Sequence, residues 1–247
     1  MSCYLCTPIY RRFNEVGGLW LQKATHDFDY LNQLVGARPV RVAAMMTQRI
    51  FGTGRILEPA RPPTVEMLHI DKHQYKLGDE DITDRDAQLN SFGSRFHAAI
   101  KNQDAGSAII WYDNGVIVSY DKNFVTRRDA QSRGAIVTGY NGTLDWNCYP
   151  TEHIRIVDHD SPRVDRVECP SDEGDGHGGG DLALHQPFVE LMQGKPNTAG
   201  NLTDGMLSVA MCLAVRRAAQ QHTVEQIPDF ALFPATDVTI DPATIEA

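Results

Sequence analysis

SAIIWYDNGVIVSY, residues 107–120, is the stretch that decides the fold of this chain. Its two runs of β-branched and aromatic residues, 107–112 and 116–120, flank Asp113-Asn114-Gly115. Such runs favour strands, and Asn-Gly supplies the positive φ angles that a tight hairpin turn needs. The stretch therefore predicts an antiparallel β-hairpin in the middle of the chain.

Strand-like composition recurs on both sides of this hairpin. A second Asn-Gly pair, Asn141-Gly142, joins two more β-rich runs, and other segments alternate between apolar and polar residues or are rich in Val and Ala. The further segments expected as strands are 39–46, 135–140, 143–147, 153–158 and 223–227. Because most of them follow one another through short turns, they predict a mainly antiparallel sheet.

Helical patterns mark the two ends of the chain. Apolar residues recur at helical spacing over 28–35, where Gly36 is expected to end the helix, and again over 182–192 and from residue 203 onward. Strands that follow one another, with helices at both ends, predict an α+β fold. We expect an open, mainly antiparallel sheet with helices on one face.

The uncovered face of that sheet would carry Ile, Val, Trp and Tyr side chains. A broad face of this kind leaves a large apolar patch in water unless another surface covers it. We therefore expect a homodimer or tetramer that associates through the open sheet face. Residues 1–230 are expected to form one domain, and residues 231–247 a C-terminal tail.

Composition and charge exclude several classes of function. The chain has 247 residues and a formal net charge of -9, and this acidic excess argues against nucleic acid as a partner. No run approaches the roughly 18 apolar residues of a spanning helix, and residues 1–10 do not form a secretion signal, so we expect a cytoplasmic protein that binds no membrane. The 5 cysteines are an odd number, which favours reduced thiols, and Cys3-x-x-Cys6 has no second pair with which to hold a metal.

Two polar clusters that contain glycines suggest a site: GGLWLQKATHDFD at 17–29 and GHGGGD at 176–181. Each precedes an amphipathic segment, so each is expected to present polar groups at the N-terminal end of a helix. Lys23 and His26 are three residues apart, which brings both to one side of a helical turn. The histidine can take a hydroxyl proton, and the lysine can stabilise the resulting negative charge. Asp27 or Asp29 either orients the imidazole or caps the helix, and a capping or solvent-facing His26 is the alternative without catalysis.

These motifs, in this order, resemble those of a known family. The GG cluster up to Asp29, the hairpin at 112–116, the segment 139–144 and the cluster at 176–181 are together similar to the C-terminal α/β domain of the Gfo/Idh/MocA (glucose-fructose oxidoreductase and inositol dehydrogenase) family. The similarity runs from about residue 9 to about residue 227. It implies an NAD(P)-dependent oxidoreductase that acts on a sugar or polyol, in which this domain supplies the substrate pocket and the oligomer interface.

The resemblance also implies roles for individual residues. Family enzymes commonly place an Asp and a His four residues apart after the GG turn, but Gln22 stands at the Asp position here. A subgroup has Lys then His three apart, which Lys23 and His26 reproduce, and we interpret these two residues as the catalytic pair. The residues expected to contact substrate are Arg11, Arg12, Asp27, His177 and Asp181.

For some of these residues a structural alternative stays open. Asp181 at the start of a helix either caps it or binds sugar hydroxyls, whereas His177 lies in a glycine run whose backbone amides can approach a ligand. Arg11 and Arg12 match basic positions that precede the GG turn in relatives. They either line the pocket or form a solvated basic face.

The sequence predicts no coenzyme fold. The only GxG that resembles the start of a dinucleotide fingerprint is in GTGRIL at 52–57. It has Leu57 where the fingerprint needs Gly or Ala, and the prolines that follow would break the required helix. The family's Glu-Lys-Pro motif has no counterpart. We therefore expect that the chain lacks the N-terminal Rossmann domain, that NAD or NADP is bound mainly by that missing domain, and that the isolated chain is inactive.

Three origins are compatible with such a chain: a split enzyme with a separate nucleotide-binding subunit, a truncation, or a repurposed domain. Two other functions stay open as well. The same scaffold supports NAD-dependent cleavage of glycosides, in which Lys23 and His26 would also serve. A non-catalytic protein that binds sugars or mediates oligomerisation is the alternative of a different class.

Overall fold

The computed structural model of the chain describes residues 13–49, 101–124, 126, 132–149, 153–168, 180–195 and 200–230. The chain divides into two compact units. The first unit holds the described residues up to 124 and those from 201 onward, and the second unit holds those from 126 to 200. Each unit contains a four-stranded antiparallel sheet. The predicted α+β class is thus confirmed, with the strands divided between two sheets.

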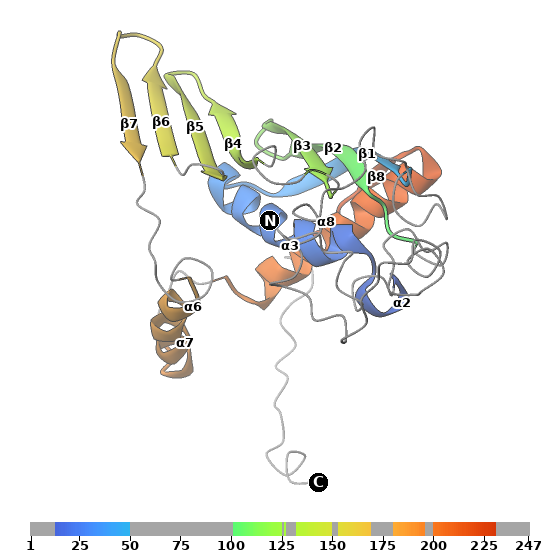
Figure 1. Cartoon of the computed structure of the whole chain (residues 1–247). Coiled ribbons are helices and arrows are strands. Elements are labelled where there is room, and N and C mark those ends of the chain that lie inside the picture. Colours follow the sequence, from blue (N-terminus) through green and yellow to red (C-terminus); the bar gives the residue numbers. More distant parts are fainter. Residues whose placement is uncertain are drawn as a thin grey trace, which may run out of the picture. The chain divides into compact units, whose positions relative to one another are not determined.

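The sheet of the first unit has the strand order β3-β2-β1-β8 (Figure 1). Its strands are β1 (Pro39–Thr47), β2 (Ala105–Tyr112), β3 (Ile117–Asn123) and β8 (Val224–Gln226). The predicted hairpin is confirmed as β2 and β3, with Ile109 opposite Ser119. Within its turn only Gly115 has a positive φ, at 87°, so the loop is of the three-residue type rather than a two-residue Asn-Gly turn.

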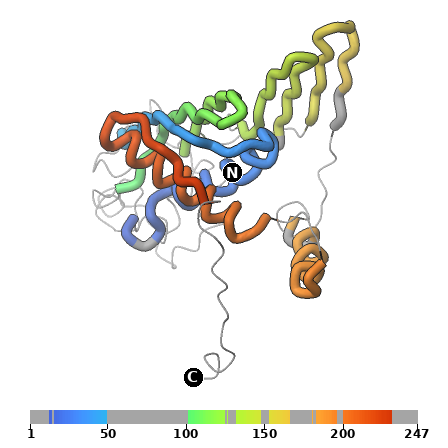
Figure 2. The backbone as a smooth tube through the Cα atoms, turned by 180° about the vertical axis from the view of Figure 1, so that it is seen from behind, coloured from blue at the N-terminus to red at the C-terminus, as the bar shows by residue number. Residues whose placement is uncertain are grey.

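Helices cover one face of this sheet, as predicted. They are α3 (Leu19–Val35) and α8 (Leu202–Gln221), whereas the short helix α2 (Phe13–Val16) packs against α3. Figure 2 shows α8 alongside β1, although the two segments are far apart in the sequence. Alternate strand residues point toward the helices and form the core with them; it includes Val42, Ala108, Ile110, Tyr112, Tyr120, Leu19, Trp20, Phe28, Met211 and Val215.

Glycines set both ends of α3. Gly17 and Gly18 have φ angles of 69° and 92°, in the region that favours glycine, and the helix begins at the next residue. At the other end Gly36 is left-handed, and its N–H donates to the Asn32 carbonyl at 2.9 Å, so the predicted helix end is confirmed.

The long helix α8 begins with a reciprocal cap. The Asn201 Oδ1 accepts from the Asp204 N–H at 3.1 Å, and the Asn201 N–H donates to the Asp204 carboxylate at 2.9 Å. This capping box satisfies two amides of the first turn. The helix begins at Leu202, one residue before the predicted start at residue 203.

The sheet of the second unit has the order β4-β5-β6-β7. Its strands are β4 (Arg133–Thr138), β5 (Gly142–Tyr149), β6 (His153–Asp158) and β7 (Val164–Glu168). Three of them were predicted, whereas β7 was missed. The unit also contains α6 (Gly180–Ala183) and α7 (His185–Met192), which replace the single helix predicted over 182–192. Pro187 lies in the first turn of α7, where a proline is tolerated.

The face of the first sheet that points away from the helices carries exposed apolar side chains. Met45 is 76% exposed, and Ile109, Ile117 and Val224 are exposed with it. The Arg41 guanidinium lies 5.7 Å from the centre of the Trp111 ring. The predicted tail, 231–247, lies outside the described residues. Among the helices that the structure describes, none is long and apolar enough to cross a membrane.

Candidate functional site

The two residues predicted to handle protons lie in one turn of α3. The helix begins at Leu19, so Lys23 and His26 are inside it, whereas the sequence pattern had placed them at its N-terminal end. Lys23 is half-buried and His26 is exposed. At about 100° per residue, Lys23 lies between the directions of His26 and Asp27 when the helix is viewed along its axis. The structure thus brings the pair to one side of α3, while their catalytic role stays a prediction.

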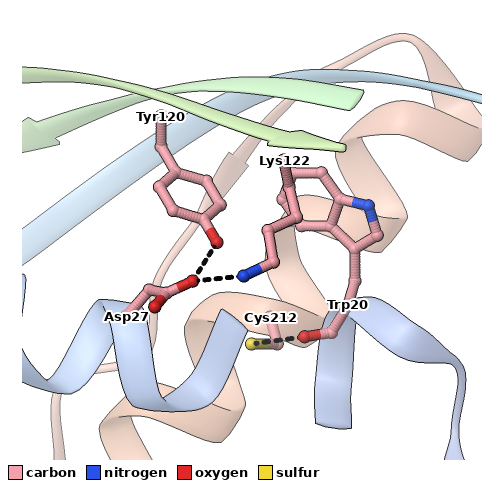
Figure 3. Close-up of polar contacts among 5 residues, drawn as sticks. All are labelled: Trp20, Asp27, Tyr120, Lys122 and Cys212. Atoms are coloured by element: carbon pink, nitrogen blue, oxygen red, sulfur yellow. Dashed lines mark hydrogen bonds and ion pairs between the residues drawn. The ribbon is translucent and has the colours of Figure 1, made fainter. Parts of the chain in front are cut away.

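Asp27 is the centre of a buried polar cluster, which we call the Asp27 cluster and define as Asp27, Tyr120 and Lys122 (Figure 3). The Lys122 Nζ and the Tyr120 hydroxyl both donate to Asp27 Oδ2, each at 2.6 Å. The Asp27 side chain is 4% exposed and the Lys122 side chain 11%. The cluster therefore joins α3 to β3 through one carboxylate oxygen inside the core.

Aromatic rings surround the Asp27 cluster. The Tyr120 ring lies 5.6 Å from Trp20 in an edge-on arrangement and 4.9 Å from Phe28, and the Lys122 ammonium lies 5.8 Å from the centre of the Phe124 ring. Burial, followed by the negative charge of Asp27, raises the pKa of Tyr120 well above its usual value. Tyr120 is therefore a neutral donor to Asp27 at physiological pH and cannot serve as a base.

This arrangement assigns Asp27 a position that the sequence did not predict. Asp27 lies in the middle of α3, whose N-cap is Gly18, so it does not cap the helix. Its buried oxygen accepts from two side chains of β3. The predicted substrate contact of Asp27 remains a prediction.

The helix α8 contacts the start of α3 at two points. The Arg216 Nη1 donates to the Gly17 carbonyl at 3.1 Å, and the same guanidinium lies 5.8 Å from the centre of the Phe13 ring. One turn earlier, the Cys212 Sγ lies 3.6 Å from the Trp20 carbonyl, to which it donates. Burial raises the pKa of the Cys212 thiol to about 12, so this cysteine is a neutral packing group rather than a nucleophile.

The other predicted site residues are described only in part or not at all. Arg11, Arg12 and His177 lie outside the described residues. Asp181 lies in the short helix α6, within the second unit, and its side chain is not described. The structure therefore shows only Lys23, His26 and Asp27 together. Within the described residues no group of three His, Cys, Asp or Glu side chains is placed to hold a metal ion.

Sequence reasoning missed Tyr120 and Lys122, although a signal was present. In β3 the residues Tyr120 and Lys122 share one phase of the strand, opposite Ala108 and Gly106 of β2. That phase faces the helices, because Ala108 and Tyr120 are buried. A lysine in the buried phase of a strand requires a partner, and an acidic residue on the apolar face of α3 was the available one.

Comparison with protein families places this chain. Residues 11–227 match the family described as "Oxidoreductase family, C-terminal alpha/beta domain", whose model is named GFO_IDH_MocA_C. The chain belongs to the Gfo/Idh/MocA oxidoreductase family. The resemblance inferred from the motifs is thereby confirmed. The comparison with curated protein sequences finds no match to this chain.

Several solved structures share the fold of this chain. The oxidoreductase domain protein from Kribbella flavida has a TM-score of 0.64 at 13% identity, with 93% of this chain and 58% of that one covered. Levoglucosan dehydrogenase in complex with NADH and levoglucosan has a TM-score of 0.63 at 14% identity, with 91% and 56% covered. The aldose-aldose oxidoreductase from Caulobacter crescentus has a TM-score of 0.56 at 14% identity, with 89% and 51% covered. The chain thus spans about half the length of these proteins.

Proposed function

We propose that this chain is the substrate-binding and catalytic C-terminal part of an NAD(P)-dependent oxidoreductase that acts on a hydroxyl of a sugar or polyol. Family membership supports the reaction class. Similar solved structures are a levoglucosan dehydrogenase in complex with NADH and levoglucosan and an aldose-aldose oxidoreductase, which supports the substrate class. The observation that carries the proposal is the arrangement of α3, which presents exposed His26 beside half-buried Lys23 on a helix anchored in the core.

In this proposal the chain's own residues manage the proton of the reacting hydroxyl. A neutral His26 imidazole accepts that proton from hydrogen-bonding distance, and the Lys23 ammonium stabilises the negative charge that develops on the oxygen. The nicotinamide coenzyme, when bound, supplies the hydride acceptor. Oxidation of a secondary hydroxyl to a ketone releases one hydride and one proton, so the two acceptors together balance the reaction.

The described residues do not provide a dinucleotide fold. Such a fold is built on parallel βαβ units, whereas every strand pair in the described part of the chain is antiparallel. We propose that NAD or NADP is bound mainly by a separate nucleotide-binding domain, because this chain matches a C-terminal domain and spans about half the length of a similar structure that holds NADH. The choice between the two coenzymes belongs to that domain.

Reconstitution tests the proposal. The purified chain is mixed with NADH and with NADPH while coenzyme fluorescence is followed, and then with NAD or NADP and a panel of sugars and polyols. The expected result is no saturable fluorescence change and no turnover, with both appearing when the chain is co-expressed with the product of the upstream reading frame. Tight coenzyme binding by the chain alone would contradict the assignment. Release of an aglycone from a glycoside would identify the cleavage reaction of the same scaffold instead.

We further propose that the chain forms a homo-oligomer through the open face of the first sheet. Ile109 lies centrally on that face, between Ala43 of β1 and Ser119 of β3, and is 45% exposed. A lysine at this position would leave its charge buried in the interface. Ile109→Lys should lower the mass measured by sedimentation equilibrium to that of a monomer. Val209→Lys, at a similarly exposed apolar position on α8, is the control that should leave the mass unchanged.

A further inference from the structure

The Asp27 cluster connects α3 to β3 through charged groups whose burial is energetically unfavourable. Its three members come from two elements, and the Asp27 and Lys122 side chains are 4% and 11% exposed. Removing two charges from water costs about as much as their attraction returns, so buried pairs can often be replaced by apolar side chains without loss of stability. The surrounding Trp20, Phe28 and Phe124 rings would accommodate such a replacement. A gain in folding stability therefore does not explain why the core contains this ion pair.

Unlike an apolar contact, the Asp27 cluster is held by hydrogen bonds, whose strength depends on the relative orientation of the groups. Apolar packing is non-directional, whereas a hydrogen bond prefers an angle above about 150° and weakens steeply below about 120°. Both donors come from β3, two residues apart on one side of the strand, and both converge on Oδ2 of Asp27. Two directional bonds to one oxygen restrain the rotation of α3 about its own axis and its position along that axis, in addition to the apolar packing of the helix.

The rotation of α3 determines where the proposed catalytic residues point. Asp27 follows His26 directly and lies one turn after Lys23, so all three turn together. Side-chain ends lie about 5–6 Å from a helix axis, and a rotation of about 10° moves them by about 1 Å. A misplacement of about 1 Å at a reacting centre can cost about 100-fold in rate.

We propose that Lys122 and Tyr120 are positioning residues that act through Asp27 to set the orientation of Lys23 and His26 toward the reacting hydroxyl. This inference rests on the proposed function for its catalytic consequence. In this proposal neither Lys122 nor Tyr120 contacts the substrate. Its structural consequence, a single fixed orientation of His26, holds whether or not the chain proves to be an enzyme.

The test replaces the charged pair by apolar side chains of similar size, in the variant Asp27→Leu/Lys122→Met. Turnover is measured with the reconstituted enzyme and the sugar that reacts in the panel. The double variant should unfold at nearly the wild-type urea concentration, yet kcat should fall by about 100-fold with KM changed less than about three-fold. Lys122→Arg keeps the charge and the donor, and should retain kcat within about ten-fold of wild type.

A second measurement does not depend on turnover. The imidazole resonances of the full 247-residue chain are recorded by carbon-proton NMR, and the His26 signal is identified by its loss in His26→Asn. In the double variant this signal should shift or split, because α3 no longer has one fixed rotation. If the wild-type enzyme turns over none of the sugars, the proposed function fails while this measurement still decides the positioning role.

The matched control removes another ion pair from the same unit. Arg217 and Glu225 pair at 3.3 Å between α8 and β8, and neither residue lies on α3. Arg217→Met/Glu225→Leu should leave both kcat and the His26 resonance unchanged. A stable Asp27→Leu/Lys122→Met variant with wild-type kcat, or with an unchanged His26 resonance, would overturn the positioning role. A control variant that shifts the His26 resonance equally would also overturn it.

Discussion

Removing Lys122 alone should destabilise the protein far more than removing the whole charged pair. Lys122→Met leaves the Asp27 carboxylate, 4% exposed, without its ammonium partner at 2.6 Å. Breaking a buried pair from one side typically costs about 3–5 kcal/mol, because one charge remains in the core without the opposite charge of its ion pair. That is a large part of the roughly 5–15 kcal/mol by which a native protein is stable.

The double variant Asp27→Leu/Lys122→Met should recover most of this loss. Neither charge remains, and the leucine and methionine side chains would pack against Trp20 and Phe28, so its free energy of unfolding should lie within about 2 kcal/mol of wild type. The coupling energy of the two positions should therefore be at least about 2 kcal/mol in a double-mutant cycle.

Urea unfolding followed by tryptophan fluorescence measures all four proteins of this cycle. The reasoning is refuted if Lys122→Met costs less than about 1 kcal/mol, because Lys122 would then not compensate a buried charge. It is also refuted if the double variant loses the sum of the two single losses, because the positions would then be independent. The slope of the unfolding free energy against urea should stay constant across the cycle, which confirms that one transition is compared.

Two further predictions follow from the local geometry. Gly18→Ala should lower the free energy of unfolding, measured in urea, by at least about 1 kcal/mol more than Gly36→Ala. Both glycines have a positive φ, but a Cβ at Gly18 would lie 2.8 Å from Phe13 Cε2, whereas nothing lies within 4 Å of a Cβ at Gly36. Equal losses in the two variants would refute this prediction. Burial raises the pKa of Cys212 to about 12 from an ordinary value of 9.0, so the thiol ionises at lower pH in the unfolded chain than in the folded one. The free energy of unfolding should therefore fall as the pH rises from about 9 to about 12, and it should fall less steeply in Cys212→Ala. Parallel curves of stability against pH for the two proteins would contradict this prediction.

The strands and helix ends of the first unit were predictable because their signals are local. The β2–β3 hairpin follows from two β-rich runs around a turn with glycine, and the end of α3 follows from a left-handed Gly36. Local signals were less reliable where several turn types fit one sequence. Asn114 precedes Gly115 as in a two-residue turn, yet in this turn only Gly115 has a positive φ, as in a three-residue loop.

The polar core of the site could not be predicted in the same way. Lys23 and His26 are three residues apart, so their shared side of α3 follows from helical spacing. Asp27 and Lys122, in contrast, are 95 residues apart in the sequence, and their contact depends on how α3 packs on β3. Only the full fold shows that the aspartate next to His26 is an anchor in the core. The division of the strands into two sheets is likewise a property of long-range pairing.

The most direct test of the central claim is the rate of the reconstituted enzyme with His26 replaced. In His26→Asn the proton acceptor is lost, so kcat should fall by about 10²–10⁴-fold while the free energy of unfolding stays close to that of wild type. His222→Asn is the matched control, since this exposed histidine ends α8 in the left-handed conformation that asparagine tolerates. Wild-type kcat in His26→Asn would contradict the assignment of α3 as the proton-handling helix.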